Sequence, residues 1–133
     1  MQLADSDISE LAIKNSQNHM SKMKVRNVEG HFENPPQGSW IAYWEEKAEK
    51  KAAECNDVTC HETNDLVGGH VLKVPFDGAV YLTPLCRDRN DWHKTDIYEV
   101  DDVNVISVPF EDLKMVPGSG TLEKWLEAIK LMK

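Results

Sequence analysis

The sequence lacks long apolar runs and has few cysteines and few aromatic residues. No stretch approaches the ~20 consecutive apolar residues that cross a bilayer, and residues 1–7 lack the basic and apolar regions of a secretory signal peptide. We therefore expect a soluble, cytoplasmic protein with no membrane partner. The 3 cysteines are odd in number, which argues against a disulfide framework. In a reducing compartment, clustered cysteines are more often metal ligands or buried apolar side chains.

Positive charge is also scarce. The chain has 15 Lys and Arg against 23 Asp and Glu, so its formal net charge is −8. This charge repels nucleic acid at long range, and the basic residues are mixed with acids, as in residues 45–51. Nucleic acid is therefore disfavoured as a partner, and a protein partner is expected.

The length of 133 residues and the hydrophobic fraction of 41% leave room for one ordinary domain with a single core. We expect an N-terminal helix and arm over residues 1–38, followed by one α+β domain over residues 39–133. Asp7 and Glu10 form a candidate capping box for a helix that runs to about Lys24. A loop then covers residues 25–38, where Pro and Gly are frequent.

Ser39 is the predicted N-cap of a second helix. Its aromatic residues Trp40, Tyr43 and Trp44 recur at helical spacing, and this stripe continues toward Cys55. Such a stripe is typical of a buried core, and a stacking platform for a ligand is the alternative. A final amphipathic helix is predicted over residues 121–132.

Two hairpins are predicted between these helices. The first joins strands 71–74 and 80–83 through Asp77-Gly78, and the second joins 95–100 and 103–108 through Asp101-Asp102. The predicted fold class is therefore α+β, with N-terminal helices, a central zinc-knuckle hairpin, a second hairpin and a C-terminal amphipathic helix.

The cysteines have the spacing of an incomplete zinc site. Zn²⁺ takes four ligands in a tetrahedron, and a short Cys-x-x-Cys knuckle supplies two of them. Cys55-x4-Cys60 is a slightly long knuckle, and Cys86 begins a second segment in which Arg89 occupies the place of another cysteine. Three free, partly buried cysteines are the alternative interpretation.

The fourth zinc ligand is left open by the spacing. The candidates are His61, His70 and His93. A Cys3His site made by the three cysteines and His70 is the simplest completion, and we favour it.

Three segments together resemble a zinc-containing HNH endonuclease module, of the treble-clef or ββα-metal type. They are Cys55-x4-Cys60, Gly68-Gly69-His70-Val71, and Pro84-Leu85-Cys86-x-x-Arg89-Asn90, and they span about a quarter of the chain. The resemblance implies a structural zinc on the three cysteines. It also implies that His70 is the general base and that Asn90 is a ligand of a hydrolytic Mg²⁺.

The sequence departs from the HNH pattern in three places. Gly69 stands where a metal-binding residue usually precedes the base, the middle Asn is missing near Tyr81, and Arg89 replaces the fourth cysteine.

Three functional hypotheses follow. The first is a zinc-stabilised, HNH-like, non-catalytic module that binds a protein. The second is a divergent metal-dependent nuclease. The third is an acidic inhibitor that acts on a nucleic-acid-binding partner.

Overall fold

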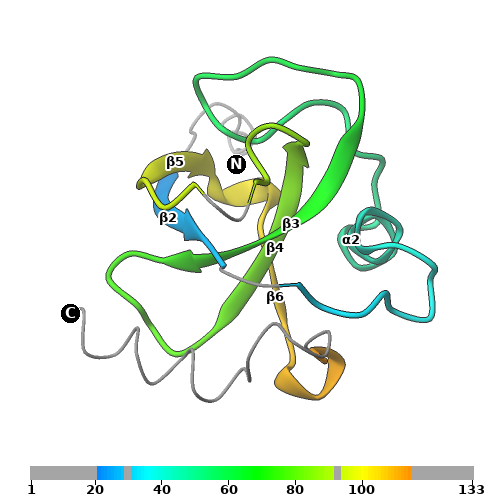
Figure 1. The fold of residues 1–133 in the computed structure, drawn as a ribbon. Coiled ribbons are helices and arrows are strands. Elements are labelled where there is room, and N and C mark those ends of the chain that lie inside the picture. The colour runs from blue at the N-terminus through cyan, green and yellow to red at the C-terminus, as the bar shows by residue number, and fades with distance from the viewer. Residues whose placement is uncertain (1–20, 29–30, 92–93, 115–133) are drawn as a thin grey trace, which may run out of the picture.

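The structure, a computed structural model, describes residues 21–28, 31–91 and 94–114. Its centre is a five-stranded antiparallel sheet with the strand order β5-β2-β3-β4-β6 (Figure 1). The strands are β2 (Lys22–Asn27), β3 (Leu66–Lys73), β4 (Val80–Cys86), β5 (Tyr98–Asp101) and β6 (Ile106–Val108). The helical elements are α2 (Trp40–Ala48) and two 3-10 turns, η1 (Asp102–Asn104) and η2 (Phe110–Asp112).

The first predicted hairpin is confirmed and is longer than expected. Strands β3 and β4 pair from Leu66 opposite Cys86 to Val71 opposite Tyr81. In the turn, Gly78 has a φ of 94°, a left-handed conformation that favours glycine. The hairpin places Cys86 at the end of the sheet that lies farthest from this turn.

The second predicted hairpin is wrong. Strand β5 pairs with β2 at one edge of the sheet, whereas β6 pairs with β4 at the other edge. The Asp101 carboxylate accepts a hydrogen bond from the Val103 N–H and starts η1 instead of a tight turn. The chain therefore crosses from one edge to the other, and the Asn104 carbonyl on the way accepts hydrogen bonds from Trp44 and Thr83.

Residues 22–24, which the predicted N-terminal helix included, belong to a strand. Along β2 the more buried residues Met23, Val25 and Asn27 alternate with Lys22 and Lys24, which are exposed. This alternation with a period of two is the pattern of a strand. Strand β2 pairs with β3, so residues on both sides of position 38 contribute to one sheet.

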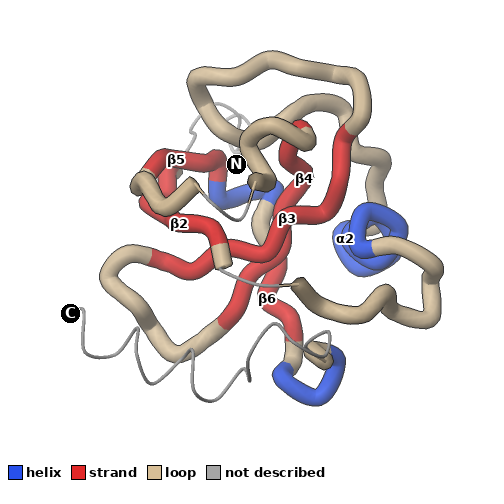
Figure 2. The backbone as a smooth tube through the Cα atoms, in the orientation of Figure 1, coloured by secondary structure: helices blue, strands red, loops and turns tan. Residues whose placement is uncertain are grey.

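The predicted fold class is therefore contradicted. The described residues form mostly a twisted antiparallel sheet with a single α-helix beside it, rather than helices flanking two separate hairpins (Figure 2). The treble-clef layout implied by the HNH resemblance is corrected for the same reason. The rest of the predicted first helix, over residues 7–20, and the predicted closing helix over 121–132 lie outside the described residues.

Helix α2 begins where the sequence indicates. The Ser39 side chain accepts a hydrogen bond from the Ala42 N–H, which satisfies one free donor of the first turn. The helix ends at Ala48, because Glu49 takes a left-handed conformation. Trp40 and Trp44 are buried, so the interpretation of the aromatic stripe as core is confirmed.

Alternating side chains of the sheet contribute to two separate apolar groups. The aromatic cluster lies between α2 and the sheet and comprises Val28, Phe32, Trp40, Tyr43, Trp44, Leu72, Phe76, Val80, Leu82, Val108 and Leu113. The sulfur cluster comprises Val25, Cys55, Val71, Leu85, Cys86, Tyr98 and Val100, with Cys60 packed against it. The three cysteines thus belong to the smaller of the two.

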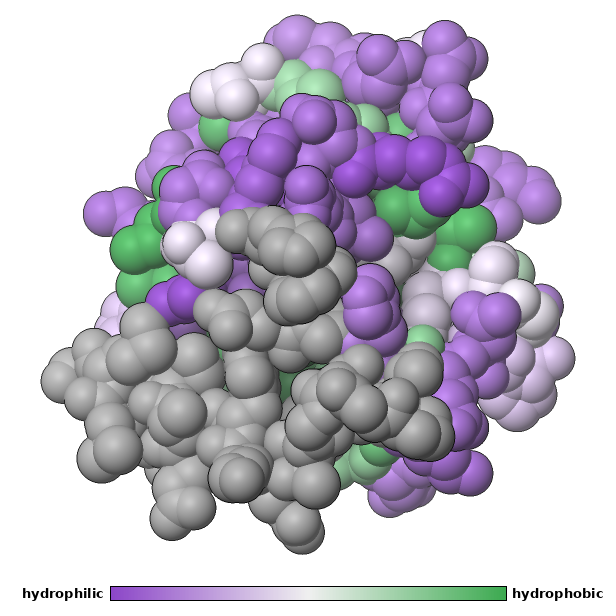
Figure 3. Space-filling model, in the orientation of Figure 1, coloured by the Kyte–Doolittle hydropathy of each residue, from purple (hydrophilic) through white to green (hydrophobic). Residues whose placement is uncertain are grey.

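The face of the molecule drawn in Figure 3 is largely polar where it is coloured. Figure 3 shows one face on which hydrophilic side chains surround small, separate hydrophobic groups. Among the described helices, none is long and apolar enough to span a membrane.

Candidate metal centre

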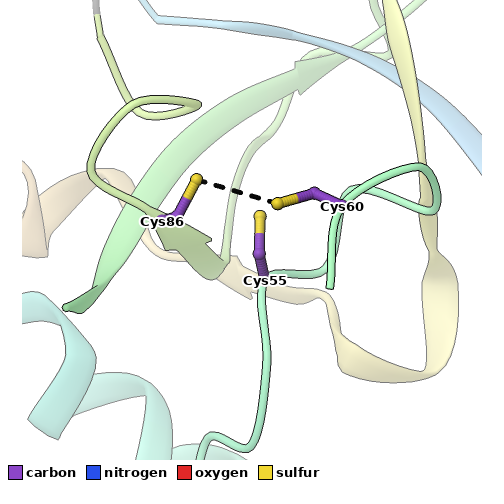
Figure 4. Close-up of side chains that lie close together, drawn as sticks. All are labelled: Cys55, Cys60 and Cys86. Atoms are coloured by element: carbon purple, nitrogen blue, oxygen red, sulfur yellow. Dashed lines mark hydrogen bonds between the residues drawn. The ribbon is translucent and has the colours of Figure 1, made fainter. Parts of the chain in front are cut away.

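The three cysteines converge at one end of the sheet, and their sulfur atoms point toward one another (Figure 4). Cys86 is the last residue of β4, while Cys55 and Cys60 come from the loop between α2 and β3. All three sulfurs lie within 4.8 Å of one another. Three residues that are up to 31 positions apart in the sequence are therefore arranged as one set of donors.

The sulfur spacing fits a tetrahedral metal site. The Sγ atoms of Cys60 and Cys86 are 3.9 Å apart. With Zn–S bonds of about 2.3 Å, two ligands of a regular tetrahedron are separated by about 3.8 Å. A disulfide would instead require about 2.05 Å, and all three cysteines are free. The arrangement can therefore hold a thiophilic metal ion without a large movement of the sulfurs.

The loop that carries Cys55 and Cys60 is docked onto the sheet through its backbone. The Asn56 N–H donates to the Pro84 carbonyl on β4, and the Val58 N–H donates to the Glu99 carbonyl on β5. The Cys60 N–H closes a turn onto the Asp57 carbonyl. These bonds fix the loop against the strand that ends in Cys86.

A buried amide adds a side-chain anchor to the same loop. Asn56 is 7% exposed and donates hydrogen bonds to the Thr83 hydroxyl and the Asp101 carbonyl. Because a buried amide is costly when it is unpaired, these bonds hold Asn56, and with it Cys55, in one position.

Backbone N–H groups surround the sulfurs. The N–H of Arg89 donates to Cys86 Sγ over 3.4 Å. Burial raises the pKa of the Cys55 thiol to about 12, while hydrogen bonds from the backbone of Cys86 and Asp57 act in the opposite direction. Without a metal, Cys55 is therefore protonated at neutral pH. A metal ion would replace this proton, and the same N–H groups would then stabilise the thiolate.

Arg89, which stands in place of a fourth cysteine, ties the two sulfur-bearing segments together. Its guanidinium donates to Asp57 over 3.4 Å and to Asp96 over 2.6 Å. It also stacks on the ring of Tyr98, with the guanidinium carbon 4.1 Å from the ring centre. Asp57 lies in the loop of Cys55 and Cys60, so Arg89 joins that loop to the turn after Cys86.

Asn27 on β2 forms hydrogen bonds to the turn that follows Cys86. This side chain is 2% exposed and donates hydrogen bonds to the carbonyl oxygens of Arg89 and Asp91, at 2.7 and 3.1 Å. The Tyr98 hydroxyl donates to its Oδ1. Asn27 thus satisfies three groups around the Cys86 turn, although it is 59 residues from Cys86 in the sequence.

The candidate histidines lie in different places. His61 is largely exposed, and its Nδ1 lies 3.8 Å from a Glu54 carboxylate oxygen. His70 lies on β3 opposite Leu82 and contacts the rings of Phe32 and Trp40, with ring centres 4.5 Å away.

Neither of the other two predicted ligands, His70 and His93, is placed at the sulfurs by the described residues. His70 is not part of the group of close sulfur donors, and it lines a separate cavity together with Asn90. His93 lies outside the described residues. Among the described residues, the three cysteines are the one group of three His, Cys, Asp or Glu donors that lie close enough to bind a metal ion.

Comparison with protein-family models, with curated proteins and with solved structures gives no match for this chain. The HNH resemblance therefore rests on the quoted motifs alone. What the structure establishes is coarser: three cysteines lie close enough to hold a metal ion.

Sequence reasoning found the three sulfurs but missed their supports. Asn27, Asn56 and Asp57 are buried polar residues, and their burial depends on strand pairing between distant segments. In the sequence, Arg89 marks the place of a missing ligand, and nothing in the pattern predicts its contacts with Asp57 and Tyr98. Its position three residues after Cys86 was the one local signal that it belongs to the site.

Proposed function

We propose that the protein is a zinc-stabilised binding module in which Cys55, Cys60 and Cys86 hold a structural Zn²⁺. The observation that carries this proposal is the convergence of three sulfurs at the spacing of a tetrahedral site. Soft thiolate ligands select zinc or another thiophilic metal over Mg²⁺ and Ca²⁺. Cysteines without disulfide bonds are consistent with a reducing compartment such as the cytoplasm.

A structural role is favoured over a catalytic one by the burial of the sulfurs. Cys55 is 2% exposed and Cys86 is 9% exposed, and both accept backbone hydrogen bonds. The ion would join the 55–62 loop to the end of β4, where Cys86 stands. Water or a histidine would complete the coordination, and His61 is the described histidine that belongs to the loop itself.

A protein partner fits the surface better than nucleic acid does. The net charge of −8 opposes a phosphate backbone. Three large apolar side chains are exposed in the described part, namely Ile97, Val103 and Phe110. They offer apolar contacts of the kind that protein interfaces use.

Metal analysis of the purified protein tests this proposal. We expect about one Zn²⁺ per chain in the wild-type protein and loss of this ion in Cys86→Ser. Retention of zinc in His61→Ala would indicate water as the fourth ligand, whereas its loss would indicate His61. Ser107→Cys is the control for adventitious binding to a thiol, because Ser107 is exposed on β6. A metal-free wild-type protein with unchanged folding stability would contradict the proposal.

A second candidate function, a metal-dependent nuclease, is favoured by one observation: His70 and Asn90 line the same cavity. Incubation with plasmid DNA or RNA and Mg²⁺ or Mn²⁺ tests it. Cleavage by the wild-type protein that is abolished in His70→Ala would favour the nuclease over the first proposal.

The third candidate, an acidic inhibitor, is supported only by the net charge of −8. Binding to a basic partner that weakens steeply with salt would favour it.

A further inference from the structure

A cavity distinct from the metal centre lies between α2, β3 and the turn after β4. It is lined by Val28, His31, Phe32, Trp40, Gly68, His70 and Asn90, and its volume is about 130 Å³. No cysteine belongs to this lining. The cavity is therefore independent of the proposed zinc site.

Gly68 of β3 lines this cavity, and its neighbour Gly69 contacts Asn90. A Cβ atom on Gly68 would lie 2.5 Å from the backbone carbon of Trp40, so the glycine allows the start of α2 to approach the sheet directly. A Cβ atom on Gly69 would lie 2.4 Å from Leu85 Cδ1 and 2.7 Å from the side-chain oxygen of Asn90. The two glycines thus leave room for Trp40 and Asn90, which line the cavity together with His70.

One polar atom at the cavity is buried without a partner in the described part of the chain. The Nε2 atom of His70 is buried and has no hydrogen-bond partner in the described part of the chain. The imidazole is held in place by Phe32 and Trp40, whose ring centres are each 4.5 Å from its own. Asn90 brings a carboxamide to the same lining, whereas the Trp40 indole N–H is already bound to the Glu33 carbonyl.

No carboxylate and no lysine or arginine lines the cavity among the described residues. Burial lowers the pKa of His70 to about 3, so its imidazole is neutral at physiological pH. His31 is the other titratable group in the lining. A charged ligand would therefore lose its hydration without gaining a counter-charge from His70.

We propose that this cavity binds a small, uncharged, planar molecule that carries a hydrogen-bond donor next to an acceptor, as in a lactam or a cyclic amide. The Asn90 carboxamide can pair with both groups of such an edge. The aromatic rings of Phe32 and Trp40 favour a flat ligand. The volume of about 130 Å³ equals that of about four water molecules in the liquid, which admits a single ring and is too small for a drug-sized molecule.

The probe for this proposal is 2-pyridone, which is flat and uncharged and has an N–H beside a carbonyl. Benzene serves as the apolar control and benzoate as the charged one. The readout is the imidazole ¹⁵N signals of the full chain labelled at histidine, with the zinc content of every sample measured. We expect 2-pyridone to shift the His70 signals saturably, with clearly weaker binding of both controls.

Variants identify the groups that bind the probe. His70→Phe keeps a flat ring but removes the buried nitrogen, and we expect it to weaken 2-pyridone binding about tenfold, as followed by ligand-observed saturation transfer. Asn90→Leu should weaken binding similarly and serves as the second variant if His70→Phe does not fold. His61→Phe changes an exposed imidazole outside the cavity and should leave binding unchanged.

Three results would overturn the proposal. They are binding of benzene as tight as that of 2-pyridone, unchanged 2-pyridone binding in Asn90→Leu, and His70 imidazole signals that do not shift at saturating 2-pyridone. Loss of probe binding with a normal zinc content would refute the cavity alone. Loss of zinc with normal probe binding would refute only the proposed metal centre.

Discussion

The aromatic cluster and the sulfur cluster stabilise the same sheet by different means. The aromatic cluster contains two tryptophans, one tyrosine and two phenylalanines, and its elements pack through apolar contact. The sulfur cluster contains one aromatic residue and two cysteines, with a third cysteine beside it. Its loops are held by the buried polar side chains of Asn27, Asn56 and Asp57. The first should therefore be stable without a metal, whereas the second depends on hydrogen bonds and on the proposed ion.

The two clusters differ in the size of their apolar side chains, and we expect the proposed ion to add stability to the smaller one. Burial of apolar area stabilises by about 25 cal/mol per Å², so a cluster with large aromatic residues contributes more than one made of Val, Leu and Cys. A metal ion supplies covalent-like links where area is lacking. Four changes test this division, and they are ordered by the size of the expected effect.

The largest effect is expected for Trp44→Ala in the aromatic cluster. Trp44 is 1% exposed, and its indole N–H donates to the Asn104 carbonyl over 3.0 Å. Its removal leaves a cavity and takes one of two hydrogen bonds from the Asn104 carbonyl, which keeps the bond from Thr83. The free energy of unfolding should therefore fall by about 3–5 kcal/mol. Urea unfolding measures this loss. The loss should be equal with and without a chelator, and a chelator-dependent loss would mean that the two clusters are not separate.

Asn27→Ala is the corresponding change in the sulfur cluster. It removes two hydrogen bonds to the Cys86 turn and leaves buried groups unpaired, so the free energy of unfolding should fall by about 2–3 kcal/mol. Zinc affinity should fall about 10–100-fold, because the turn that carries Cys86 loses its anchor. Competition with a chromophoric chelator measures this affinity. If zinc affinity stayed unchanged while stability fell, Asn27 would support the fold but not the site.

The third change concerns His70, which lies beside the aromatic cluster. Its pKa is lowered from 6.5 to about 3 by burial, so the unfolded chain binds the proton more readily than the folded one. The stabilisation is present above pH 6.5 and is lost as the pH falls toward 3. The loss should reach about 2 kcal/mol between pH 7 and pH 4.5. Urea unfolding across this range should show a flatter profile for His70→Phe, and identical profiles for both proteins would contradict the burial of His70.

The smallest effect is expected for Arg89→Lys. Lysine keeps the charge near Asp57 and Asp96, but it loses the forked hydrogen bonds and the flat contact with Tyr98. The free energy of unfolding should fall by about 1 kcal/mol, with a weaker affinity for zinc. The matched control is Lys94→Gln, which breaks an ion pair with the exposed Asp88 carboxylate and should cost about 0.5 kcal/mol or less. Equal losses in both variants would show that Arg89 is an ordinary surface residue.

Sequence patterns predicted correctly those elements that are determined by residues close together in the chain. The Ser39 cap, the aromatic stripe of α2 and the Asp77-Gly78 turn all depend on neighbouring residues, and the structure confirms each of them. The cysteines were also recognisable, because soft metal ligands are rare residue types with few other roles. Their convergence could be inferred, although their partners could not.

The errors arose where distant pairing decides the structure. Strands β5 and β6 are separated by only four residues, and each could have paired with the other. Strand β2 offered β5 a longer partner, with Lys22 to Val25 opposite Tyr98 to Asp101, and β4 offered β6 an apolar edge. Such competition between strands cannot be resolved from the residues of one hairpin. The spacing of the cysteines likewise favoured His70 as the fourth ligand. In the structure, the His70 side chain contacts the rings of Phe32 and Trp40 instead.

The sequence by itself determined the composition of the site: three sulfurs, no fourth cysteine, and a net charge of −8 that disfavours nucleic acid. Only the tertiary structure decided which side chains surround those sulfurs and where the histidines lie. The physical reason is that a ligand's identity is a property of one residue, whereas coordination and burial depend on strand pairing. Here that pairing joins residues 22–27 to residues 66–73 and 98–101, and it brings Asn27 beneath the turn after Cys86.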